Sequence, residues 1–277
     1  MHTNTRESGL ESTIINHLAA QNGYELGGNA DYNKEYAVDE TRLMRFLADT
    51  QPEEVEQLGL STSEVKRLQF LTRLSGEIAK RGVVDVLRRG VKIYPANLTM
   101  FCMTPSARNP EAVKNFEKNI FSVARQLKYS KDSAALALDF CIFVNGLPII
   151  TCELKNQLTK QNVDDAVQQY KNDRSPREAL FSFKRCMVHF AADDARVRFC
   201  TRIMGRDSWF LPFDKGCSDG AGNPPNPEGL MTDYLWKEIL TKASLRTSSR
   251  ATPRLWWKRT RKRKRRRKSK SSPDTTN

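Results

Sequence analysis

The chain lacks the features that mark membrane, secreted and zinc-binding proteins. No apolar run approaches the roughly 20 residues that a transmembrane helix requires, and residues 1–12 contain no apolar signal-peptide core. The six cysteines are scattered without a Cys-x-x-Cys pair, and there are only three histidines. These absences argue against a disulfide framework and a zinc site. They predict a cytoplasmic protein with reduced thiols and no membrane contact.

A phosphate-binding loop for ATP is missing as well. The pattern Gly-x-x-x-x-Gly-Lys-Ser/Thr, whose backbone N–H groups cradle nucleotide phosphates, does not occur in the sequence. We therefore expect no ATP-binding site and no ATP-driven translocation by this chain.

Positive charge is concentrated at one end of the chain. The net charge is +14, but residues 246–277 hold 14 Lys and Arg against one acid, Asp274, and so carry +13 of it. Residues 1–245 are left with +1, so the charge of the whole chain says little about their function. We expect a globular domain over residues 1–245 and a basic, disordered tail over residues 246–277.

Helix-like segments come first in the globular part, and strand-like segments follow. Apolar residues recur at helical spacing near 7–22, 38–49 and 62–80, and an amphipathic helix is expected at 160–173. From about residue 84 the pattern changes to β-type runs, at 83–87, 90–96, 121–129 and 186–193, and a Pro/Gly-rich loop follows at 216–229. This order predicts an α/β or α+β domain.

The clearest element is a β-hairpin that carries charged residues. Residues 137–144 and 148–155 are β-rich runs separated by Asn-Gly-Leu, and Asn-Gly is a strong hairpin signal. Asp139 lies in the first strand, and Glu153 and Lys155 lie on one face of the second. Two carboxylates can hold Mg²⁺, which activates water and polarises a phosphate. The ammonium group beside them can stabilise developing negative charge or help to orient the nucleophile.

The hairpin register decides whether the two acids meet. A two-residue loop would place Asp139 opposite Cys152 and would send Glu153 to the other face. A three-residue loop, Asn-Gly-Leu, places Asp139 opposite Glu153, with Cβ atoms about 4.5–5.5 Å apart. A metal site therefore requires an odd-length loop or a bulge.

The same charges also have an ordinary interpretation, because an Asp and a Glu-x-Lys occur together by chance in many chains and strand charges usually face solvent. Here the acids interrupt apolar strands, and burying two carboxylates without a cation is costly. The apolar neighbours are Leu138, Phe140, Ile142, Ile149, Ile150 and Leu154.

From about residue 7 to 243 the chain resembles the N-terminal part of the R subunit of type I restriction enzymes. The segments that carry the resemblance are FSVARQLKYS (121–130), ALDFCIFVNGLPIITCELKNQLTKQNVDDAVQQYKNDRSP (137–176), LFSFKRCMVHFAADDARVRFCTRI (180–203), FLPFDKG (210–216), GAGNPPNP (220–227) and YLWKEIL (234–240). The resemblance implies a PD-(D/E)xK restriction-endonuclease-like fold, an α/β fold with a central mixed sheet flanked by helices and with N-terminal helices.

The resemblance makes Asp139, Glu153 and Lys155 the catalytic set, with Asp139 and Glu153 as ligands of Mg²⁺. Leu138 stands where the motif's name has proline. The implied activity is cleavage of double-stranded DNA. The implied partners are the methyltransferase and specificity subunits of the complete enzyme. In that enzyme the R subunit continues into an ATP-driven motor.

Three further residues are accessory candidates. The family has a Gln-x-x-x-Tyr motif on the helix after the Glu-x-Lys strand, and it would end here at Tyr170. Ala166 occupies the glutamine position, so Gln169 is the substitute. In the functional interpretation, these residues orient Lys155 or contact DNA. In the structural interpretation, Tyr170 is a half-buried tyrosine and Gln169 is a solvated glutamine. Glu11 on the first helix is a candidate for a further acidic group, or a capping or surface glutamate.

The basic tail matches nothing in the family. One hypothesis is a frameshift near residue 246. With suitable codons for this tail, removing two bases from the codon of Arg246 gives a reading frame whose product resembles the start of the family's motor domain. The alternatives are a nuclear-localisation-like run and a nonspecific nucleic-acid arm. For the whole chain, the alternatives to an endonuclease are a catalytically silent fragment that docks on DNA or the methyltransferase, and a nucleic-acid binder that acts through its tail.

Overall fold

The computed structural model describes residues 7–103, 110–156, 160–217, 220 and 222–245. A seven-stranded mixed sheet forms its centre, with strand order β1-β6-β7-β8-β9-β10-β11. The strands are β1 (Glu25–Gly27), β6 (Phe121–Lys128), β7 (Ala137–Val144), β8 (Leu147–Leu154), β9 (Val188–Ala192), β10 (Val197–Cys200) and β11 (Leu211–Pro212). The pairs β1–β6 and β8–β9 are parallel and the other neighbours are antiparallel.

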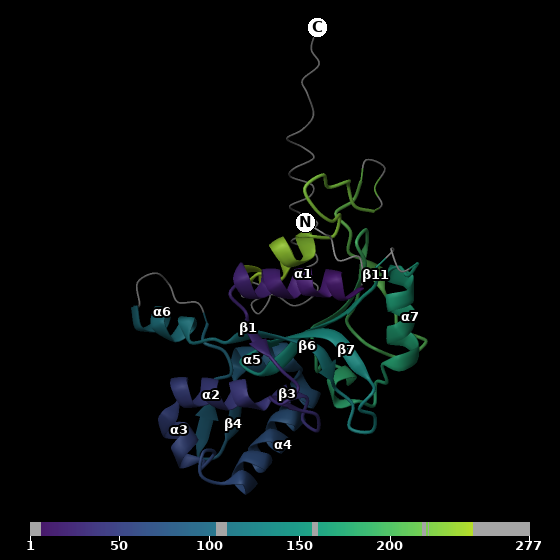
Figure 1. Cartoon of the computed structure of the whole chain (residues 1–277). Helices are drawn as coiled ribbons and strands as arrows, with labels where there is room; N and C mark the ends of the chain where they lie inside the picture. The colour runs from purple at the N-terminus through teal and green to yellow at the C-terminus, as the bar shows by residue number, and fades with distance from the viewer. Residues whose placement is uncertain (1–6, 104–109, 157–159, 218–219, 221, 246–277) are drawn as a thin grey trace.

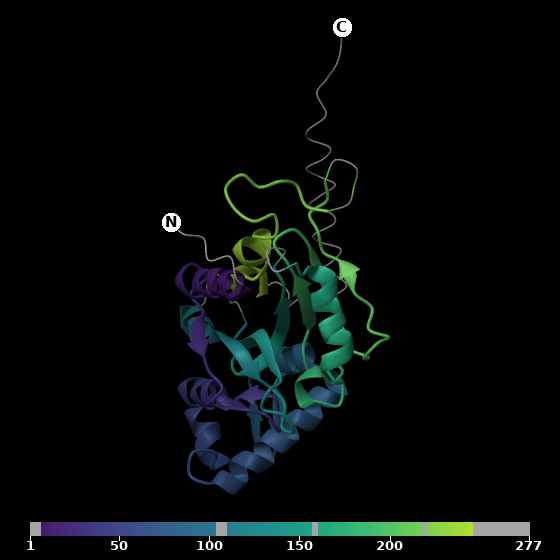
Figure 2. The same ribbon diagram turned by 45° about the vertical axis from the view of Figure 1, so that its right-hand side comes forward.

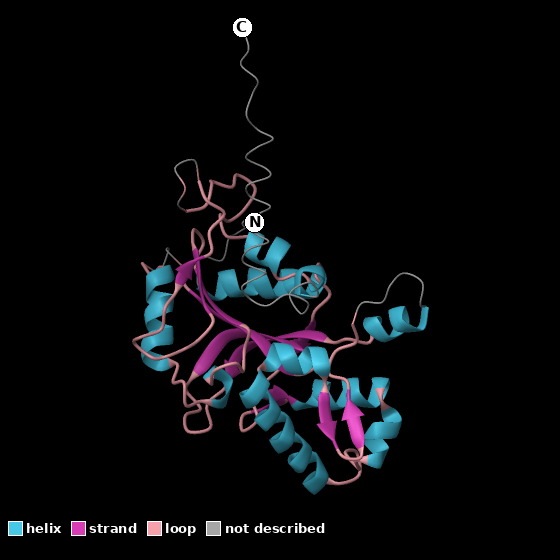
Figure 3. Cartoon of the chain, turned by 180° about the vertical axis from the view of Figure 1, so that it is seen from behind, coloured by secondary structure: helices cyan, strands magenta, loops and turns pink. Residues whose placement is uncertain are grey.

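Helices and two small hairpins surround this sheet (Figures 1 and 3). The helices are α1 (Glu7–Ala20), α2 (Glu40–Thr50), α3 (Pro52–Gln57), α4 (Glu64–Arg81), α5 (Val83–Arg89), α6 (Pro110–Glu117) and α7 (Val163–Asp173), with a 3₁₀ turn η2 (Ala179–Phe181) and a short π-helical segment η3 (Leu235–Ile239). The hairpins pair β2 (Tyr32–Asn33) with β3 (Val38–Asp39) and β4 (Val91–Ile93) with β5 (Ala96–Leu98).

The central strands are buried on both faces. On β7, Phe140 and Ile142 pack into a core with α1, α2, α4 and α5, whereas Cys141 and Phe143 pack into a second core with α7 and η2. Alternate residues of a strand point to opposite faces, so a sheet covered on both sides needs nearly continuous apolar strands. This explains why the hairpin sequence is apolar except at its few charged positions.

Distant parts of the chain meet at one end of the molecule. Helix α1 lies beside η3 (Figures 1 and 2), and Asn22 Nδ2 donates to Trp236 O at 2.8 Å and to Leu240 O at 3.2 Å. The segment that contains η3 therefore belongs to the same folded body as α1, and Leu245 is buried in the same core. The predicted disordered tail lies outside the described residues.

Most of the predicted helices and strands are present, but the secondary structure predicted for one segment is wrong. Residues 83–87, expected as a β run, belong to helix α5. Gly82, with a φ of 89°, separates α5 from α4, and Val83, Val86 and Leu87 are buried at helical spacing. Tertiary burial of this face outweighs the preference of valine for strands. Within the described part of the chain, no helix is both long and apolar enough to span a membrane.

Candidate active site

A bulge in the β7–β8 hairpin brings Asp139 and Glu153 together. Asn145 and Gly146 form a two-residue turn, with φ angles of 49° and 78°, and Val144 pairs with Leu147. The register then shifts between Ile142 and Phe143, so that Phe140 faces Cys152. Continued by one residue, this register sets Asp139 across from Glu153. The bulge expected as the alternative to an odd-length loop is thus what the protein uses.

The turn itself is buried, which fixes the hairpin in the molecule. Asn145 Oδ1 accepts from Ile120 N at 2.7 Å, and its Nδ2 donates to Met100 O at 2.9 Å. On the other side, Gly146 O accepts from Asp39 N at 2.8 Å, at the start of α2. The two positive φ angles suit Asn and Gly, the residues that tolerate this conformation best.

Glu153 is completely buried and held by an arginine. Its Oε1 lies 2.5 Å from Arg174 Nε, while Arg174 also donates to Tyr129 OH at 3.0 Å and to Ala137 O at 2.8 Å. Among the described residues, Glu153 Oε2 has no hydrogen-bond partner. Burial, and then the charge of Asp139, raises the pKa of Glu153 to about 8, although Arg174 and Lys155 oppose the shift.

Asp139 is partly exposed beside Glu153, and Lys155 follows directly after β8. Asp139 Oδ2 accepts from Leu154 N at 2.6 Å, which ties the carboxylate to the neighbouring strand. Lys155 N donates to Ala192 O at 2.9 Å, so strand-like pairing with β9 continues to this residue. The ammonium of Lys155 is close enough to Glu153 to oppose the rise in its pKa. The three predicted catalytic side chains therefore come from one end of two adjacent strands.

Glu11 reaches the same region from α1. It is buried, pairs with Arg125 Nε at 2.8 Å and accepts from Gln126 Nε2 at 2.6 Å. Gln126 Nε2 also lies 3.4 Å from Asp139 Oδ1. Glu11 is thus neither a capping nor a surface residue, and one side chain links it to Asp139.

Tyr170 and Gln169 lie on α7, and Tyr170 is enclosed. The Tyr170 side chain is 0% exposed, and its hydroxyl is 2.8 Å from Thr151 Oγ1, which is 2.7 Å from His189 Nδ1. Tyr170 therefore offers no surface to DNA and packs under the strand that carries Glu153. Gln169 is partly buried, and in the described part of the structure its Oε1 has no hydrogen-bond partner.

Arg174 and Gln126 were not identified from sequence as parts of this region. Both lie inside segments that carry the family resemblance, but an isolated Arg after a helix and an isolated Gln in a strand form no pattern. Their partners are 21 and 115 residues away in the chain. The only available signal was that a buried acid next to a second acid needs a cationic partner.

The donor set fits a hard divalent cation. Asp139 and Glu153 supply carboxylate oxygens, the ligands that Mg²⁺ prefers together with water, and Glu153 Oε2 is a buried oxygen left without a partner among the described residues. The described residues contain no group of three or more His, Cys, Asp or Glu side chains that could hold a metal. Two carboxylates would leave most coordination positions of Mg²⁺ to water, which this ion commonly retains.

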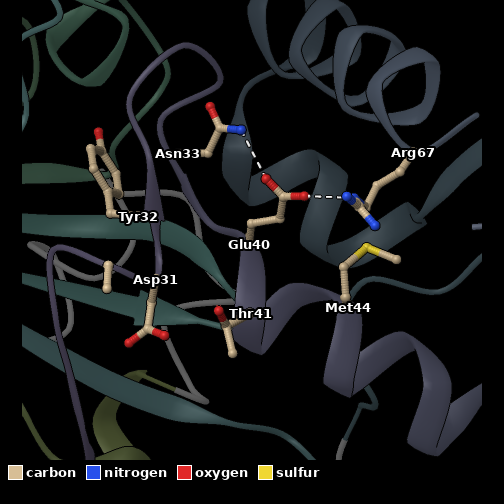
Figure 4. A pocket seen from close by; sticks show the side chains of 8 residues that line it. Asp31, Tyr32, Asn33, Glu40, Thr41, Met44 and Arg67 are labelled. Carbon is tan, nitrogen blue, oxygen red and sulfur yellow. Dashed lines mark hydrogen bonds and ion pairs between the residues drawn. The ribbon is translucent and has the colours of Figure 1, made fainter. Parts of the chain in front are cut away.

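A separate polar pocket of about 370 Å³ lies between β2, α2 and α4 (Figure 4). Glu40 sits between Asn33 and Arg67 in this pocket, with its oxygens 2.8 Å from Asn33 Nδ2 and 2.8 Å from Arg67 Nε. Asp31 is paired with Arg42 Nη1 at 3.0 Å. These charges already neutralise one another, and the pocket shares no residue with the Asp139–Glu153 region.

The mixed sheet flanked by helices, with two acids and a lysine converging on its central hairpin, has the architecture of the restriction-endonuclease-like α/β proteins. The chain belongs to the family described as type I restriction enzyme R protein N terminus, whose model matches residues 4–208. A Methanocaldococcus jannaschii protein named as the MjaVIIIP endonuclease subunit of a type I restriction enzyme is 37% identical over 71 residues. That match covers 25% of this chain and only 7% of the relative.

Proposed function

We propose that this chain is a Mg²⁺-dependent endonuclease domain that hydrolyses phosphodiester bonds of double-stranded DNA in a type I restriction system. The observation that carries the proposal is that Asp139 and Glu153 lie across from each other on the hairpin, with Lys155 close enough to act on Glu153. Glu153 Oε2 is buried and has no hydrogen-bond partner among the described residues. Membership of the R-subunit family supports the same activity. In the complete enzyme, we expect the methyltransferase and specificity subunits to be partners and ATP to be used by a motor outside this chain.

The proposed chemistry divides among three residues. Asp139 and Glu153 would hold Mg²⁺, which when bound would supply positive charge at the scissile phosphate and activate the attacking water. Lys155 places its ammonium beside the phosphate, where it stabilises the negative charge that develops in the transition state. Arg174 keeps Glu153 in place from the buried side.

The test is nicking of supercoiled plasmid by protein that lacks residues 246–277, assayed with Mg²⁺ and with Mn²⁺. We expect weak, sequence-independent nicking that needs no ATP, because the chain has no phosphate loop. The variants Asp139→Ala, Glu153→Ala and Lys155→Ala should each lose about as much activity as the triple variant, since residues that act as one unit are non-additive. Glu35→Ala, which removes an exposed acid far from this set in sequence, is the matched control.

Circular dichroism on each variant separates loss of function from loss of fold. Undiminished nicking by a folded triple variant would refute the proposed site. Absence of nicking by the wild type with either metal would favour the silent docking fragment. If deletion of residues 246–277 abolishes both the affinity for DNA and the salt dependence of that affinity, the tail is favoured as the binding element.

A further inference from the structure

Strand β6 is irregular at the point where it passes Asp139. Gln126 has a φ of 46°, in the left-handed region that few side chains adopt. The ladder between β6 and β7 pairs Arg125 with Phe140 and Leu127 with Leu138, so that Gln126 and Asp139 lie between two paired positions. A disfavoured backbone conformation persists only where its surroundings hold it.

Asn29 holds this backbone from outside the strand. Its Nδ2 donates to Gln126 O at 3.1 Å, and its Oδ1 accepts from Lys128 N at 2.7 Å. The edge strand β1 pairs with β6 as far as Gly27, so the side chain of Asn29 continues the pairing past the end of that strand. Asn29 thus holds the backbone at the irregular residue and two residues after it.

The carboxamide of Gln126 bridges two acids. Its Nε2 donates to Glu11 Oε2 at 2.6 Å and lies 3.4 Å from Asp139 Oδ1. Ionised carboxylates only accept hydrogen bonds, so the amide nitrogen, with its two hydrogens, is the atom that must face them. A neutral donor shared by two carboxylates holds them near each other in spite of their mutual repulsion.

We propose that Gln126 is a positioning residue of the nuclease site, which ties Asp139 on β7 to Glu11 on α1 and fixes the Asp139 carboxylate for the divalent cation. The proposal rests on the proposed function. Glu11 is a firm anchor because it is 4% exposed and is also paired with Arg125. Gln126 acts through Asp139, whose other oxygen is held by the Leu154 N–H.

The test compares three variants of the full chain: Gln126→Met, Asn29→Ala and Lys160→Met. Methionine matches glutamine in length but has no N–H donor, whereas Asn29→Ala keeps the carboxamide and releases the backbone clamp. Lys160 is the matched control, since it is also an exposed non-glycine residue in the left-handed region, with a φ of 61°. Mn²⁺ binding is measured by electron paramagnetic resonance without DNA, and plasmid nicking is measured separately.

We expect Gln126→Met to bind Mn²⁺ about tenfold more weakly than the wild type, the factor that corresponds to one net hydrogen bond. The kcat for nicking should fall by a similar factor with little change in KM. Asn29→Ala should show a smaller loss in the same direction, and Lys160→Met should stay within about twofold of the wild type. Thermal unfolding in EDTA reports whether each variant is folded before metal is added.

Mn²⁺ binding and nicking by Gln126→Met at wild-type levels would overturn the role of Gln126 alone. If Gln126→Met does not fold, Gln126→Gly replaces it, because glycine adopts the left-handed conformation without strain and also lacks the carboxamide. A folded wild-type protein that neither binds Mn²⁺ nor nicks DNA would refute the proposed function, and the role of Gln126 with it.

Discussion

The ion pair between Arg174 and Glu153 offers a test of how this region is held together. Both side chains are almost fully buried, at 2% and 0% exposure, and their atoms are 2.5 Å apart. Removing one partner of a buried pair leaves an uncompensated charge, which costs about 3–5 kcal/mol. Arg174→Met also deprives Tyr129 OH and Ala137 O of a donor. We therefore expect Arg174→Met to lower the free energy of unfolding by about 3–5 kcal/mol.

That loss corresponds to a fall in Tm of roughly 10 °C for a protein of this size. The assay is urea and thermal unfolding of the metal-free protein, followed by circular dichroism. The double variant Arg174→Met/Glu153→Met should recover more than half of the loss, because replacing both members of a buried pair by apolar groups is often neutral.

Arg89→Met is the matched control for the same substitution. Arg89 is 77% exposed and its pair with Asp85, at 3.1 Å, should contribute no more than about 1 kcal/mol. Equal losses for Arg174→Met and Arg89→Met would refute the buried pair as a structural element. A double variant that is less stable than Arg174→Met would show that Glu153 keeps a favourable environment without the arginine.

Two further predictions concern the fold around the site. Burial lowers the pKa of His189 from 6.5 to about 3, so the neutral form is favoured in the folded state. The stability that this group contributes is fully present above pH 6.5 and is lost as the pH falls toward 3, by up to about 1.4 kcal/mol per pH unit. His189→Asn, which can keep a bond to Thr151, should lack this component in urea unfolding at a series of pH values, and an unchanged slope would contradict the assignment. Gly146→Ala would place Cβ 2.4 Å from Asp39 O, whereas no described atom lies within 4 Å of the same addition at Gly222, whose φ is similarly positive. Gly146→Ala should therefore destabilise the protein by at least about 2 kcal/mol more than Gly222→Ala; equal losses would mean that the turn can move away from α2.

Much of the site's framework was predictable because it depends on short-range rules. Strand alternation puts Glu153 and Lys155 on one face, and Asn145-Gly146 marks the turn. The choice between a longer loop and a bulge was left open, because both give Asp139 the same partner. Residues 83–87 were misassigned because β-branched residues suit a strand locally, while packing of α5 against the core favours the helix.

Most helices and strands, and the hairpin that carries Asp139 and Glu153, could be predicted from the sequence, because they follow from periodicity and turn signals within a few residues. Tertiary structure alone decided what surrounds those acids. Arg174, Gln126 and Glu11 come from segments far apart in the chain, and no local pattern specifies which polar side chain meets which. The enclosure of Tyr170 likewise depends on tertiary packing, since its exposure is set by the segments that the rest of the fold places over α7.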